Sequence, residues 1–309
     1  MKEILIGEII KQRRLELHLT QEELCEGICE PPTMSRIENG KQTPSRSKLN
    51  LLLQRLGLPS NKYYALMSEN ELEIERLKTE IVSCNMRRDS HEGLVKLQKL
   101  IDSVADDDHL TQQFILRSKA LLGYEENGQI VPYCMEEQVE LLNHAIRLTI
   151  PFFDTNNIGK HWYSLEEMKI INQLGITYGD NLCENKAIDI YYQFLKHIQK
   201  RPLQVNSDTV PVIILLYYNY SKFLCHMEHY HEAIDIANEG WEFSIRWGRS
   251  TFLGGLFYVL GESYYNLQQM KNCKQFYLQS YYAYINMNNE SDAQIIKDII
   301  RNYFPNIRL

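Results

Sequence analysis

The chain has 309 residues, enough for more than one hydrophobic core, and its 44% apolar content is that of a folded globular protein and excludes a disordered tail. Its net charge of -7 is divided unevenly. Residues 1–68 carry ten Lys and Arg against eight Asp and Glu, and the remainder carries 23 against 32, so the net charges are about +2 and -9. The acidic part should repel polyanions, which leaves the N-terminal segment as the surface for any nucleic acid.

The N-terminal segment begins with the signals of two helices. A first helix is expected from about Ile4 to Leu17. Thr20 and Glu23 then form an S/T-x-x-E capping box, which starts another helix at Gln21. The apolar residues of this helix follow at helical spacing, so it should pack through one face.

The next stretch predicts a further helix after a tight turn. The Pro31-Pro32 pair suits a first helical turn, where the missing N–H groups would have no partner anyway. Met34 and Ile37 would face inward, and Asn39-Gly40 supplies a left-handed stop. A last helix of this segment is expected from about Arg46 to Leu56. Two short helices joined in this way are typical of a helix-turn-helix, whose second helix enters the major groove of DNA.

These residues carry a family resemblance. The run from Leu19 to Pro44 reads LTQEELCEGICEPPTMSRIENGKQTP and is similar to the Xre-type helix-turn-helix. GIC followed after five residues by SRIENG resembles the form found in the peptide-pheromone-responsive regulators of Gram-positive bacteria, the Rgg/PlcR/PrgX (RRNPP) family. In the common Xre pattern a glycine occupies the position of Cys29 and the turn is one residue longer. The resemblance implies a sequence-specific transcriptional regulator.

The resemblance also implies roles for single residues. Arg14 and Glu38 match a pair that forms an internal salt bridge, so we assign them to structure. Arg36 is the best candidate for reading bases, because a guanidinium can grip guanine or a phosphate through two bonds; an ordinary surface arginine paired with a carboxylate is the alternative. The predicted DNA-contacting residues are Gln21, Glu30, Pro32, Thr33, Arg36, Lys41, Ser45 and Arg46. Gln21 and the last three would touch phosphate.

We call residues 69–309 the body, and it begins with a charged helix. Ser68 and Glu71 form a second capping box, and the helix runs toward Arg88 with one apolar side made of Leu72, Leu77 and Ile81. We interpret it as the connector. The domains expected are a helix-turn-helix domain at 1–68, a connecting helix at 69–90 and a ligand-binding and dimerisation domain at 91–309.

The remainder reads as amphipathic helices with tetratricopeptide-like spacing. The pattern is clear from Leu174 to Tyr191 and from Leu260 to Tyr277, and weaker from Tyr220 to Ala237. Its small positions Ala187, Ala233 and Cys273 lie 46 and 40 residues apart, wider than the usual repeat of about 34, which longer helices would explain. Degenerate copies are expected at Glu92–Val104 and at Phe114–Leu122 with Glu136–Leu148. The predicted fold is all-α, a helix-turn-helix bundle followed by an α-solenoid.

A solenoid presents the first helices of its repeats along one concave surface, which suits an extended peptide. The repeat frame places on it Lys119, Asn172, Tyr218, Lys222, Tyr258, Glu262 and Tyr265, with Asn219 and Asn266 beside them, which a frame shift of one residue would turn away. The asparagine amide both donates and accepts, as a peptide backbone requires, and Lys222 could hold a peptide carboxylate. Each of these residues could instead be an ordinary helix residue.

Other chemistry finds little support in the sequence. The seven scattered cysteines, with no secretory signal before them, read as reduced thiols of a cytoplasmic protein. His226, His229 and His231 fall in an expected turn, and no nucleotide, hydrolase or zinc-protease motif occurs. No apolar run approaches the roughly 20 residues that span a bilayer. We therefore expect no enzyme, no cofactor, no metal and no membrane association.

The leading hypothesis is a homodimeric regulator of a double-stranded DNA operator, controlled by a short signalling peptide or another small ligand. Resemblance supplies the dimer. Ligand control requires that the ligand bind two arrangements of the DNA-binding heads with different affinity. The alternative is a repeat-domain scaffold or anti-repressor with incidental DNA affinity, and an RNA-hydrolysing or metal enzyme is a distant third.

Overall fold

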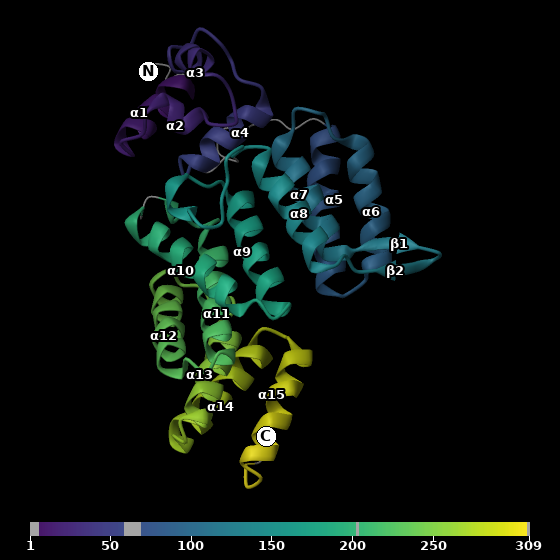
Figure 1. Ribbon diagram of the computed structural model, residues 1–309, viewed down its shortest axis with the longest axis vertical. Coiled ribbons are helices and arrows are strands. Elements are labelled where there is room, and N and C mark those ends of the chain that lie inside the picture. The colour runs from purple at the N-terminus through teal and green to yellow at the C-terminus, as the bar shows by residue number, and fades with distance from the viewer. Residues whose placement is uncertain (1–5, 59–68, 202–203, 308–309) are drawn as a thin grey trace. The chain divides into compact units, whose positions relative to one another are not determined.

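The computed structural model describes residues 6–58, 69–201 and 204–307. These residues are helical almost throughout, so the predicted all-α fold is confirmed (Figure 1). The chain divides into two compact units, Met1–Thr177 with Lys200–Asn206 and Tyr178–Gln199 with Ser207–Leu309. The domain limits predicted at 68 and 90 concern function rather than compactness, and they stay a prediction.

The first unit contains the predicted DNA-binding head, which is made of helices α1 to α4, and the first helix pairs of the body. Its helices are α1 (Ile6–Glu16), α2 (Gln21–Cys25), α3 (Pro31–Glu38), α4 (Arg46–Arg55), α5 (Glu69–Met86), α6 (Ser90–Ser103), α7 (His109–Leu122), α8 (Met135–Arg147), the short 3-10 helix η2 (Ile158–Lys160) and most of α9 (Leu165–Asp180). The four head helices share one apolar core, to which each contributes, with Ile10, Leu24, Met34 and Leu52 fully buried. The head is therefore a folded bundle with its own core.

The charged helix predicted as a connector is α5, and it packs along α6. Leu77 and Ile81 are buried as expected, but Leu72 is 55% exposed and Ile74 takes the inward place. The apolar face of α5 is thus formed by Ile74, Leu77 and Ile81. In the sequence, the additional apolar residue Leu72 made this spacing harder to recognise. The cap predicted at Ser68 lies outside the described residues.

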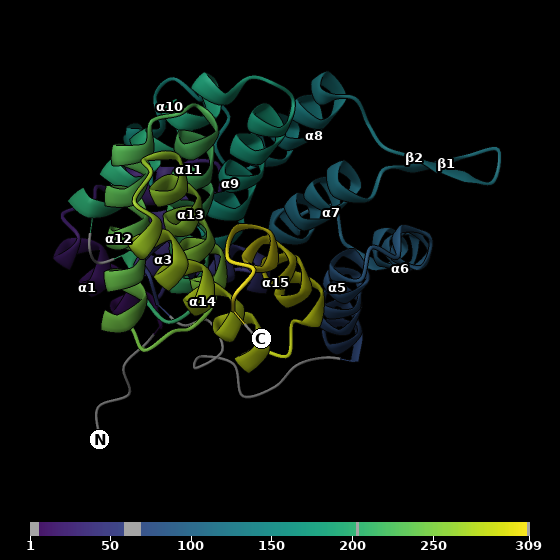
Figure 2. The same ribbon diagram turned by 90° about the horizontal axis from the view of Figure 1, so that it is seen from below.

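A β-hairpin interrupts the helices of the first unit, and it was not predicted from the sequence. Strand β1 (Tyr124–Glu126) pairs antiparallel with β2 (Gln129–Val131) and projects beyond α7 and α8 (Figure 2). Asn127 and Gly128 form the turn with φ values of +51° and +77°. Asn-Gly is the favoured pair for a two-residue hairpin turn, so the local signal was present although the strands are only three residues long.

The second unit consists of successive antiparallel helices. They are α10 (Glu184–Lys200), α11 (Val210–His226), α12 (Tyr230–Arg246), α13 (Leu253–Asn266), α14 (Met270–Asn286) and α15 (Glu290–Tyr303). Each of α11 to α14 packs on the next helix in the chain, and α11 also lies beside α13. The predicted small positions Ala187, Ala233 and Cys273 are all fully buried, which confirms the repeat frame. No helix of the described ranges is both long and apolar enough to cross a bilayer.

Candidate DNA-binding and peptide-binding sites

Local capping fixes the two motif helices of the head. The Glu23 amide donates to the Thr20 hydroxyl at 3.1 Å, and the Thr20 amide donates to the Glu23 carboxylate at 2.7 Å, so the predicted capping box is confirmed. Helix α3 begins at Pro31, as predicted, and buries Met34 and Ile37. The orientation of α3 on the head is thereby set by its inner face, which leaves the opposite face outward.

A buried ion pair also holds α3 in place. Arg14 donates to both carboxylate oxygens of Glu38, at 2.6 and 3.0 Å, and to the carbonyl oxygen of Leu19 at 2.6 Å. Its hydrogen bond to Glu38 raises the pKa of Arg14. The structural assignment of this pair is confirmed. Gln21 joins the network, since its amide nitrogen donates to Glu38 at 2.6 Å; its contact with phosphate remains a prediction.

The outward face of α3 carries the residues predicted to read bases. Glu30, Pro32 and Arg36 are exposed and Thr33 is half-buried. Pro32 and Arg36 stand four residues apart, so they lie on the same side of the helix. A guanidinium and a carboxylate on this face could pair with guanine and cytosine edges respectively.

The residues predicted to hold phosphate follow α3. Lys41 and Ser45 are exposed, and Arg46 is half-buried. Ser45 is the N-cap of α4, where its hydroxyl accepts from the Lys48 amide at 3.4 Å. The first turn of α4 therefore offers backbone N–H groups next to cationic side chains, an arrangement that suits phosphate.

Seven of the nine residues predicted to contact peptide lie on the adjacent helices α11 and α13 of the second unit, and five of these seven have half-buried side chains. Tyr218 and Lys222 stand four residues apart on α11, and all five are half-buried, the others being Tyr258, Glu262 and Tyr265 on α13. Burial raises the pKa of Tyr218, so its hydroxyl stays protonated. The three tyrosines offer an apolar ring and a polar hydroxyl, and Lys222 and Glu262 offer charges, so the group can contact both the backbone and the side chains of a ligand.

Two of these side chains already have partners inside the second unit. The Lys222 ammonium lies 3.3 Å from a carboxylate oxygen of Asp180 and 4.5 Å from the ring centre of Phe223. The Tyr277 hydroxyl donates to Glu262 at 2.5 Å. Sequence reasoning missed Asp180 and Tyr277, because both contacts join helices whose relative register the sequence does not encode. Lys222 and Glu262 thus place one positive and one negative group on neighbouring helices.

The remaining predicted peptide residues are placed less favourably. Asn172 and Asn219 are each 4% exposed, and Asn219 is hydrogen-bonded to Tyr191. A ligand could reach these two side chains only after a rearrangement. Asn266 is exposed and donates to the Glu262 carbonyl oxygen at 2.9 Å, while Lys119 on α7 belongs to the first unit, as does Asn172. Their peptide contacts remain predictions.

A cavity of about 760 Å³ lies elsewhere in the second unit. Lys271, Lys274, Leu278, Tyr282 and Met287 of α14 and its end contribute to its wall. None of the nine predicted peptide residues lines it. It is therefore a second place where a small ligand could sit, and any binding experiment must distinguish it from the α11 and α13 face.

A capped helix-turn-helix with an exposed arginine on the outward face of its second helix, followed by stacked helix pairs, defines the class of helix-turn-helix transcription regulators with a body built of repeats. Residues 10–62 match the helix-turn-helix family, and residues 78–303 match the RNPP family C-terminal domain. The chain belongs to the RNPP family, which confirms the resemblance found in the sequence.

Several solved structures share this fold. Bacillus thuringiensis PlcR in complex with the peptide PapR7 and DNA has a TM-score of 0.60 at 20% identity, covering 94% of this chain and 98% of that chain. ComR from S. thermophilus in complex with DNA and its signalling peptide ComS has a TM-score of 0.52 at 14% identity, covering 96% and 99%. ComR from Streptococcus vestibularis with its signalling peptide XIP gives 0.52 at 13%, covering 96% and 98%. No curated protein matches the sequence.

Proposed function

We propose that this chain is a sequence-specific DNA-binding regulator of transcription, which acts as a homodimer and responds to a short signalling peptide. Helix α3 reads the major groove through Arg36 and its neighbours, and the loop to α4 holds phosphate. The second unit holds the peptide on the face shared by α11 and α13. A cytoplasmic location fits this role and the seven free cysteines.

One observation carries the DNA-binding part. The inner face of α3 is fixed by Met34, Ile37 and the pair of Glu38 with Arg14, whereas Arg36 points away from the core and is exposed. A helix held firmly on one side with a cation on the other meets the requirement for base recognition, because the reading side chain needs no repositioning of its backbone.

DNA binding can be tested without knowing the operator. Full-length protein would be used to select duplexes from a random pool, and the enriched duplex would be footprinted at several salt concentrations. We expect a protected site whose affinity falls steeply with salt and exceeds that for scrambled DNA by at least about a thousandfold. Equal affinity for all sequences would reject the regulator and favour the repeat-domain scaffold.

Peptide binding can be tested with short synthetic peptides carrying either a free C-terminal carboxylate or a C-terminal amide. If Lys222 holds the carboxylate, the free acids bind more tightly than their amides to the wild type, and this difference disappears in Lys222→Ala. Binding in the α14 cavity would instead be lost in Leu278→Arg and retained in Lys222→Ala. That second result would move the peptide site away from the α11 and α13 face.

A further inference from the structure

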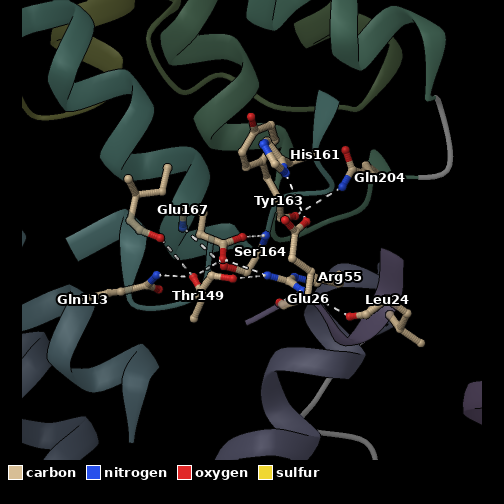
Figure 3. Close-up of polar contacts among 11 residues, drawn as sticks. Leu24, Glu26, Arg55, Gln113, Thr149, His161, Tyr163, Ser164, Glu167 and Gln204 are labelled. Carbon is tan, nitrogen blue, oxygen red and sulfur yellow. Dashed lines mark hydrogen bonds and ion pairs between the residues drawn. The ribbon is translucent and has the colours of Figure 1, made fainter. Parts of the chain in front are cut away.

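One buried guanidinium joins the head to the helices that follow it within the first unit. Arg55, the last residue of α4, is 1% exposed. One of its terminal nitrogens donates to the carbonyl oxygens of Leu24 and Glu26 at 3.1 and 2.5 Å, where α2 ends. The other donates to the carbonyl oxygen of Thr149 at 3.0 Å and lies 3.5 Å from a carboxylate oxygen of Glu167 (Figure 3). A single side chain thus caps a head helix and grips the body.

The carboxylate that faces Arg55 is itself held rigidly. Glu167 is 0% exposed and accepts from the Ser164 amide at 2.5 Å, while the Glu167 amide donates to the Ser164 hydroxyl at 3.3 Å. This reciprocal pair is a capping box at the start of α9, where the helix dipole favours negative charge. The Thr149 hydroxyl donates to the same carboxylate. This hydroxyl also accepts a hydrogen bond of 2.6 Å from the side-chain amide of Gln113. The start of α9 and the turn after α8 therefore both hold this carboxylate.

The backbones of head and body also meet closely beside this pair. Gly27, in the turn between α2 and α3, has a φ of +68°, and a Cβ atom there would lie 1.8 Å from the Thr149 carbonyl oxygen. Only glycine fits such an approach. The neighbouring Glu26 carboxylate lies 3.1 Å from Nδ1 of His161. The junction is thus built around the turn of the helix-turn-helix itself.

We propose that Arg55 and Glu167 are positioning residues, which fix the orientation of the DNA-binding head on its body and thereby set the spacing of the two half-sites that a dimer selects. Apolar contacts are non-directional, but a buried ion pair is satisfied in one geometry only, since a shift leaves a charge without its partner. This inference rests on the proposed function. It adds the residues that determine head geometry, none of which faces DNA.

The first test measures spacing preference. The full-length double variant Arg55→Met/Glu167→Met removes both charges together, which usually preserves folding better than removing one. Duplexes selected by the wild type would be altered by inserting single base pairs between half-sites, each of which rotates one half-site by about 34°. We expect the wild type to discriminate at least about tenfold against one insertion and the variant at most about threefold, with equal affinity for a single half-site. Unchanged discrimination in the variant overturns the proposal.

Two further arms keep the outcomes separate. The matched control Arg76→Met/Glu73→Met removes an exposed ion pair on α5 and should leave spacing preference unchanged. Hydrogen exchange without DNA should show α2 to α4 exchanging at least about tenfold faster in the junction variant, with α11 to α14 unaffected. If wild-type protein shows no sequence-dependent DNA binding, the proposed function fails, and unchanged exchange in the variant would reject the anchor independently.

Discussion

Arg36 carries the most specific claim about DNA. It is exposed on α3 between two buried residues, so its removal leaves the core of the head intact. We expect Arg36→Ala to cost about 1–3 kcal/mol on the preferred site and to flatten the preference over scrambled DNA. Anisotropy titrations with both duplexes measure this. Lys41→Ala is the control, because losing a phosphate contact should weaken binding to all sequences alike. If folded Arg36→Ala keeps the wild-type preference between the two duplexes, base reading by Arg36 is rejected.

Lys222 and Asp180 should affect peptide binding in opposite directions. Their ion pair has side chains that are 22% and 55% exposed, so it contributes little stability and a peptide carboxylate can replace Asp180. Lys222→Ala should weaken the binding of free-acid peptides by about 10–100-fold, whereas Asp180→Asn should strengthen it. Calorimetry tests both, with Glu232→Gln on α12, outside the predicted peptide residues, as the control. Equal affinities for all four proteins would place the peptide elsewhere.

Glu166 predicts how the first unit responds to acid. Burial alone would raise the pKa of this carboxyl, but Arg117 at 2.6 Å and Lys169 at 3.2 Å outweigh burial and lower the pKa to about 2. An unfolded chain has a glutamate pKa of about 4.3, so the carboxylate contributes stability above that pH, and the contribution is lost as pH falls toward 2. The difference between these two pKa values corresponds to about 3 kcal/mol of folding stability at neutral pH.

The variant Glu166→Gln should therefore lower the free energy of unfolding at pH 7 by a few kcal/mol, with the loss shrinking below about pH 4. Urea titrations at pH 7 and pH 3 measure the difference. Glu232→Gln on α12 is a suitable control, because that carboxylate is exposed and its ion pair is a surface contact of 3.4 Å with a histidine nitrogen. A deficit of the same size at both pH values would contradict the assigned ion pairs.

At the scale of elements, the sequence predicted what local chemistry determines. The capping box at Thr20, the prolines that open α3 and the Gly40 stop act within one helical turn, and all three are found. The repeat frame was also recovered, because small and apolar residues recur at the positions that must be buried. The β1 and β2 strands were missed, since three-residue strands carry no measurable alternation.

The candidate sites were only partly predictable, for a physical reason. Helical periodicity tells which side of a helix a residue occupies, so Arg36, Tyr218 and Lys222 could be assigned to faces. It does not tell how deep that face lies, and Asn172 proved to be buried. Contacts such as that of Arg55 with Glu167, 112 residues apart, depend on tertiary packing that no local pattern encodes.

The α13 and α14 pair offers a test of the repeat packing. Gly261 packs under the buried ring of Tyr277, and an added Cβ would lie 2.9 Å from a ring atom. Gly261→Ala should separate the helices and destabilise the protein by about 1–3 kcal/mol, measured by urea unfolding. Gly159→Ala is the matched control, because no atom lies within 4 Å of the position that its added methyl group would take. An equal effect of both substitutions would argue against the repeat packing.

At the scale of the whole chain, charge restricts where DNA can bind. The first 68 residues carry a net charge of about +2 and the rest about -9, so the body opposes non-specific binding. A single head of such low charge releases few counterions and binds weakly. Useful affinity must therefore come from base contacts and from linking two heads.

Two linked heads lead to the last prediction, that the protein binds its operator as a homodimer. Heads on successive major grooves lie about 34–36 Å apart, and joining them raises affinity without any new contact. Light scattering of the complex with selected DNA should give two chains per duplex, and the footprint should cover two half-sites about one helical turn apart. A duplex with one half-site is the control and should bind at least about a hundredfold more weakly. One chain on a fully protected operator would contradict the dimer and, with it, any regulation through head spacing.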